Sequence, residues 1–105
     1  PWLAAHPPRV EWFSGQFAPS EIEGDHALVG AVSAAHQAVK GVLPAVTGVT
    51  YGADMRHFIN IAGIPCLMYG ADDVVGAHAP NESVAIADML TCAKTVALAT
   101  RNWCS

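Results

Sequence analysis

The sequence predicts an α/β fold, with helices packed on a mixed, largely parallel sheet. Segments with helical periodicity alternate along the chain with short segments rich in β-favouring residues. One of the latter, residues 64–70, is a nearly continuous apolar run that ends in glycine, which is typical of a strand covered on both faces. The 105 residues are 52% hydrophobic and only 13% charged. This composition indicates a folded domain with apolar surface that a partner covers.

The first 24 residues are predicted to hold one strand and one connection. Residues 1–8 are rich in proline and show no element, whereas residues 9–13 mix β-favouring residues with alternating polarity and predict a short strand. Residues 14–24 contain two glycines, a proline and acidic residues without an apolar period. That composition indicates a loop, and one able to join two domains.

A helix is predicted over residues 26–40. Asp25 is a suitable N-cap and Gly41 a suitable terminating residue. The apolar residues of this segment recur on one helical face, as an amphipathic helix requires: Leu28, Val32, Ala35 and Val39.

Strands and helices then alternate to the end of the chain. Residues 46–51 are β-rich, and Asp54 is placed to cap a second helix that ends at Gly63. Residues 64–70 follow as the expected central strand. Residues 86–102 form the last predicted helix, with acidic Asp88 in its first turn and basic Arg101 in its last, as the helix dipole favours.

Composition and charge exclude several classes of function. A net charge of -4, with five basic residues scattered along the chain, offers no track for a phosphate backbone and argues against nucleic acid as a partner. The apolar stretches are too short to cross a membrane and no signal peptide precedes them, so a cytoplasmic location is expected. The three cysteines lack the close spacing of zinc or redox motifs and are expected to be reduced.

His78 is the main candidate for chemistry. It lies on a short loop between the predicted central strand and the last helix, where an imidazole is well placed to bind a metal. A zinc site takes three or four protein ligands, so one histidine needs companions. A lone loop histidine is also a common surface residue, and spacing alone leaves both interpretations open. The other four histidines are interpreted as structural or exposed: His6, His26, His36 and His57.

Three further polar residues flank the same predicted sheet edge, where open α/β sheets bind ligands. Asp54 is either a helix N-cap or a catalytic carboxylate. Arg56 lies where the helix dipole disfavours a cation, which fits an anion-binding task or an exposed side chain. Glu82 is either a solvated acid or holds the His78 loop by accepting backbone hydrogen bonds.

Three pieces of the chain, taken in order, carry a resemblance to a known family. Residues 51–58 match a segment of Gly, small residue, Asp, any residue and Arg; residues 62–70 match an Ala-Gly-Ile-Pro strand that leads to glycine; residues 77–84 match an Ala-His-x-Pro-x-Glu-x-Val loop. Together they resemble the C-terminal part of the zinc-dependent metallopeptidase and deacylase family that contains acetylornithine deacetylase, succinyl-diaminopimelate desuccinylase and glutamate carboxypeptidase.

This resemblance implies a partial catalytic domain of a zinc-peptidase-like fold. It assigns His78 as a zinc ligand and places Arg56 near a substrate carboxylate. Asp54 and Glu82 match family positions to which no chemical role is assigned. The complete enzyme would hold two zinc ions, with cobalt or manganese as alternatives, and would hydrolyse the amide bond of an N-acyl amino acid or small peptide as a homodimer. Residues 1–13 would end an inserted lid and dimerisation domain, residues 14–24 would be a linker, and residues 25–105 would belong to the catalytic domain.

The chain also departs from the family pattern. The His-x-Asp motif and the Glu-Glu pair that supply the other ligands and the general base do not occur here. No catalytic residue is therefore assigned, and the 105 residues alone are predicted to be inactive. The alternative is a noncatalytic α/β interaction or regulatory domain in which the His78 loop is only a connection.

Overall fold

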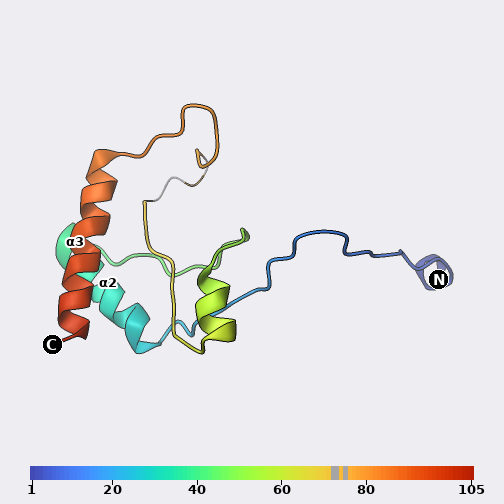
Figure 1. The fold of residues 1–105 in the computed structure, drawn as a ribbon, viewed down its shortest axis with the longest axis horizontal. Helices are drawn as coiled ribbons and strands as arrows, with labels where there is room; N and C mark the ends of the chain where they lie inside the picture. Colours follow the sequence, from blue (N-terminus) through green and yellow to red (C-terminus); the bar gives the residue numbers. More distant parts are fainter. Residues whose placement is uncertain (72–73, 75) are drawn as a thin grey trace.

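The computed structural model of the chain describes residues 1–71, 74 and 76–105. In this part the regular elements are all helical: α1 (Trp2–Ala5), α2 (Ala27–Lys40), the π-helical turn η1 (His57–Ile61) and α3 (Ile86–Trp103). Figure 1 shows α2 and α3 side by side, with long irregular segments between and around the helices. Since no described residue lies in a strand, the predicted α/β fold with a mixed sheet is wrong.

The three segments predicted as strands are irregular chain. Within the described residues, no backbone hydrogen bond joins residues 9–13, 46–51 and 64–70 to one another. A strand exists only when its N–H and C=O groups pair with those of a neighbouring strand. The β-favouring composition of these segments does not supply that pairing.

The apolar run at residues 64–70 is covered on one side only, and not on both as its composition predicts. Ile64 and Met68 are exposed, at 52% and 43% of their surface. Leu67 and Tyr69 are half-buried, and both lie against residues of α2 and α3. This segment therefore packs one face on the helix pair and leaves the other face open.

Helix α2 forms almost where the sequence predicts it, but a different residue caps it. The N-cap is His26 and not Asp25, because the His26 Nδ1 accepts a hydrogen bond of 3.0 Å from the backbone N–H of Leu28. Gly41 ends the helix as predicted. Its φ of 80° is left-handed, which glycine adopts without steric cost, and its N–H donates to the Gln37 carbonyl at 2.8 Å.

The His26 cap leads to a first prediction. We expect His26→Ala to lower the free energy of unfolding by about 1 kcal/mol, the usual cost of removing an N-cap acceptor. Urea denaturation followed by circular dichroism measures this change. His26→Asp is the matched control, since its carboxylate keeps an acceptor at the same position. Equal stability of the alanine variant and the native protein would contradict the capping role.

The second predicted helix is short and of a different kind. The sequence predicts a helix from Asp54 to Gly63, whereas the structure has the π-helical turn η1 over His57–Ile61. Asp54 contributes through its backbone carbonyl, which accepts the N–H of His57 at 2.9 Å. Gly63 ends the element with a left-handed φ of 66°.

The core is small and lies between α2 and α3, and the predicted last helix is confirmed as α3. Small side chains allow the two helices to approach closely, and few of the described residues are buried: Val29, Ala35, Thr95 and Ala99. The radius of gyration is 18.4 Å, compared with about 13 Å for a compact domain of this length. The excess reflects the N-terminal segment, which extends away from the helices (Figure 1).

The N-terminal segment exposes large apolar side chains. Trp12 and Phe13 are 80% and 93% exposed, and Trp2 is 71% exposed. Exposed apolar side chains of this size are costly in water. Such a surface is typical of a segment that another part of a protein or a partner covers. None of the helices in the described residues combines the length and apolar character that a membrane span needs.

Candidate functional site

His78 lies in a series of tight turns ahead of α3. The Ala79 N–H donates to the Gly76 carbonyl at 3.1 Å, and the Glu82 N–H donates to the Ala79 carbonyl at 3.2 Å. Both His78 and Asn81 have a left-handed φ of 62°. A non-glycine residue pays about 1 kcal/mol or more for this backbone conformation, and such strain gathers at binding sites. The His78 side chain is exposed.

Metal-binding side chains do not gather around His78 in the described part of the chain. Residues 1–71, 74 and 76–105 contain no group of three or more His, Cys, Asp or Glu side chains able to hold a metal ion. An exposed imidazole suits a zinc ion as one ligand of three or four. His78 therefore fits a metal as one ligand of a site, and the other described residues do not complete that site.

Arg56 is half-buried and held by the segment before α2. Its Nη1 donates to the backbone carbonyl of Gln16 at 3.1 Å, and its guanidinium lies 4.5 Å above the ring centroid of Phe17. This stacking is a cation–π contact. The Nε of Arg56 is buried and has no hydrogen-bond partner within the described residues. Arg56 is therefore not a freely exposed side chain, and its buried Nε–H is an unused donor.

Two more contacts hold residues 14–24 in place. The Asn60 side chain donates to the Pro19 carbonyl at 2.9 Å. Phe17 covers Gly52 so closely that a Cβ on Gly52 would come within 2.5 Å of the ring. The close approach that glycine permits at this position is thus made by a side chain of the predicted linker at residues 14–24.

The two carboxylates of the predicted site lie at the surface. Asp54 has 87% of its side chain exposed and its Oδ1 is 3.8 Å from Nε2 of His57, a contact that is an ion pair only when the imidazole is protonated. An ion pair this exposed contributes little to stability. Glu82 is also exposed. Its role in holding the loop stays a prediction.

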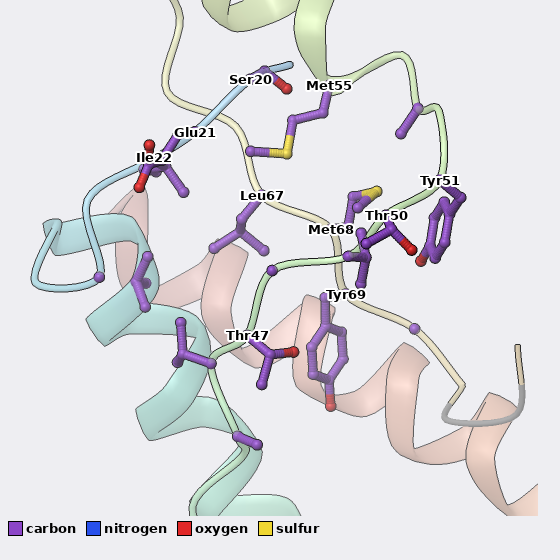
Figure 2. A pocket seen from close by; sticks show the side chains of 18 of the residues that line it. Ser20, Glu21, Ile22, Thr47, Thr50, Tyr51, Met55, Leu67, Met68 and Tyr69 are labelled. Carbon is purple, nitrogen blue, oxygen red and sulfur yellow. The ribbon is translucent and has the colours of Figure 1, made fainter. Parts of the chain in front are cut away.

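A groove of about 850 Å³ lies beside α2. Its walls come mainly from residues 17–22, 44–53 and 67–71, so part of the predicted site loop contributes to it. Figure 2 shows Tyr51 and Met55 at this groove together with Leu67, Met68 and Tyr69. Neither Arg56 nor His78 lines the groove. The structure brings Arg56 to the linker and leaves His78 on its own loop.

The sequence patterns do not predict one polar cluster of the structure. His36 of α2, Tyr69 and Thr95 of α3 are joined by two hydrogen bonds in the core. Leaving the fully buried hydroxyl of Thr95 without a partner would cost about 1–3 kcal/mol. No motif links these residues, because they lie on three segments far apart in the sequence.

Comparison with known proteins identifies the family. Residues 8–102 match the sequence profile of Peptidase family M20/M25/M40. Because the match covers most of the chain, the chain belongs to this family, which confirms the resemblance read from the residues.

Three relatives illustrate the similarity. The N-formyl-4-amino-5-aminomethyl-2-methylpyrimidine deformylase of Bacillus subtilis (strain 168) is 31% identical, over 99% of this chain and 26% of that protein. The protein of the same name from Halalkalibacterium halodurans is 28% identical over the same shares. The protein YgeY of Escherichia coli (strain K12) is 30% identical over 79% of this chain and 21% of its own length. No solved structure gives a significant match.

The chain thus spans about a quarter of the length of the deformylases that it matches.

Proposed function

We propose that the chain is the C-terminal part of a metal-dependent amidohydrolase. In the complete protein it would help to hydrolyse the amide bond of an N-acyl amino acid or a small peptide. The observation that carries this proposal is the family match over residues 8–102. The relatives named deformylases support it, since removal of a formyl group from nitrogen is the hydrolysis of an amide.

His78 is the residue that we assign to the metal. Its exposed imidazole and its strained backbone support this role, because a loop held in a costly conformation fixes where the ring is presented. Two zinc ions, with cobalt or manganese as alternatives, would polarise the acyl carbonyl and lower the pKa of a bound water. The other ligands and the general base are assigned to parts of the protein outside these 105 residues.

Arg56 is assigned to the substrate carboxylate. The chemistry of the guanidinium supports this assignment, since an arginine can offer a carboxylate two parallel N–H donors. The contacts to Gln16 and Phe17 would hold the guanidinium ready for that ligand. Asp54 and Glu82 are assigned to ordering the two loops and not to chemical steps.

The domain assignment belongs to the same proposal. Residues 1–13 would be the end of a lid and dimerisation domain, residues 14–24 the linker and residues 25–105 part of the catalytic domain. The exposed aromatic residues of the N-terminal segment support a covered position in the complete protein, which we propose to be a cytoplasmic homodimer.

The complete protein tests the proposed function. It should hydrolyse N-formyl or N-acetyl amino acids, lose activity when a chelator removes its metal, and regain activity when zinc, cobalt or manganese is returned. Turnover that survives complete metal removal would contradict the metal assignment. No turnover of any N-acyl amino acid, N-formyl amine or dipeptide would favour the noncatalytic alternative.

The isolated chain provides a further prediction. We expect residues 1–105 alone to show no turnover and only weak zinc binding, because the described part offers a metal one ligand and not three. Equilibrium dialysis against zinc and an assay with the substrates above measure both quantities. Tight stoichiometric zinc binding by the isolated chain would contradict the proposed division of the site.

A further inference from the structure

A hydrogen-bonded bridge joins three segments of the chain in the core. The Tyr69 hydroxyl donates to Oγ1 of Thr95 at 3.1 Å, and Nδ1 of His36 lies 2.6 Å from the same Tyr69 oxygen. The two rings also meet edge to face, with their centroids 5.8 Å apart. The bridge thus connects α2, the segment at residues 64–70 and α3.

The Tyr69 hydroxyl is shared by both hydrogen bonds of the bridge. A phenol has one hydrogen, and Tyr69 gives it to Thr95. The tautomer of His36 that carries a proton on Nδ1 would complete the bridge by donating to the Tyr69 oxygen. Thr95 is completely buried, and His36 and Tyr69 are half-buried. Hydrogen bonds in such a place fix direction and distance more narrowly than apolar contact does.

The position of the bridge relates it to His78. Tyr69 is the last half-buried residue before the exposed Gly70 and Ala71, and Thr95 lies in the middle of α3. The bridge consequently ties together the chain that precedes His78 and the helix that follows it. Figure 2 shows Leu67, Met68 and Tyr69 in succession along the segment that crosses the helix pair.

We propose that His36, Tyr69 and Thr95 are positioning residues that hold the turns at residues 76–82 where His78 can bind metal. This inference rests on the proposed metal-binding role of His78. The three side chains touch neither metal nor substrate in this proposal. They fix Tyr69, which precedes the turns in the sequence, and the middle of α3, which follows them, against α2.

The test compares variants of the complete protein that either remove or keep one hydroxyl group. Tyr69→Phe removes both hydrogen bonds and keeps the ring, and Thr95→Val removes the buried acceptor and keeps the branched shape. Thr95→Ser keeps the hydroxyl. Thr91→Val is the matched control, because the Thr91 hydroxyl lies in the same helix and bonds to the Ala87 carbonyl of that helix.

Zinc affinity is measured by competition with a chromophoric chelator, and amide hydrogen exchange is measured at residues 76–82. Tyr69→Phe and Thr95→Val should weaken zinc binding by about 10-fold or more, the usual effect of losing a group that orients a metal ligand. They should also speed exchange in the turns. Thr95→Ser and Thr91→Val should retain native affinity and native exchange.

The outcomes separate this inference from the proposed function by including His78→Ala. If His78→Ala loses zinc while Tyr69→Phe and Thr95→Val bind it normally, the positioning role is wrong and the metal role of His78 stands. If His78→Ala binds zinc normally, the metal role is wrong, and the positioning role falls with it. Thr95→Val, which preserves shape, decides the result if Tyr69→Phe proves too unstable to purify.

Discussion

His78→Ala in the complete protein is expected to lower both metal affinity and turnover by about 100-fold or more. Losing a group that only orients a ligand costs 10–100-fold, so losing the ligand itself should cost at least the upper end of that range. Metal content of the purified variant, zinc titration and the rate of hydrolysis of an N-acyl amino acid measure the effect. Stability in urea should change little, because the side chain is exposed.

Two companion variants sharpen the result. His78→Cys should bind zinc more tightly than His78→Ala, because a thiolate is itself a zinc ligand. His6→Ala removes an exposed histidine of the N-terminal segment and should leave metal affinity unchanged. An alanine variant at position 78 with native metal content and native turnover would refute the assignment. A His6→Ala variant with the same loss would show that the effect is not specific to the loop.

The two long helices could be predicted because their signals are local. The apolar period of α2 and the left-handed glycine at position 41 lie within one segment, and the structure confirms both. The N-cap could be predicted only to within one residue, because His26 and Asp25 are both able to accept the hydrogen bond. Helix signals of this kind need no information from distant parts of the chain.

The predicted strands failed for the opposite reason. Residues 64–70 have the composition of a buried strand, but a strand is defined by its hydrogen-bonded neighbour, which composition does not name. Within the described residues no other segment pairs with it. What the segment does instead, packing Tyr69 between α2 and α3, depends on residues 33 and 26 positions away. No local pattern reports contacts at such separations.

The site residues show the same difference between local signals and long-range contacts. The resemblance singles out His78 and Arg56 by their motifs, which are local. The strained φ of His78 and the contacts of Arg56 with Gln16 and Phe17 were not predictable, since the latter cross 40 residues of sequence. The sequence therefore points to the two residues. The structure adds the backbone conformation of His78 and the contacts that hold Arg56.

Arg56→Ala is expected to lower kcat/KM by about 10- to 100-fold for substrates that carry a free carboxylate. A hydrogen bond between a guanidinium and a carboxylate contributes about 1.5–3 kcal/mol, and each 1.4 kcal/mol is a factor of ten. The same substitution should matter much less for a substrate whose carboxylate is blocked as an amide. Arg56→Lys should recover only part of the loss, because an ammonium lacks the planar pair of donors. Steady-state kinetics with the free and blocked substrates measure the difference.

Phe17→Leu separates the two tasks that Arg56 performs. This substitution removes the cation–π contact, which is worth about 0.5–1 kcal/mol at an exposed site, and leaves the guanidinium in place. If Arg56 binds substrate, Phe17→Leu should cost only a few-fold and should keep the preference for a free carboxylate. If it instead reproduced the whole loss for both substrates, Arg56 would act by fastening the segment at Gln16 and Phe17. The substrate-binding assignment would then be wrong, because blocking the carboxylate would change nothing.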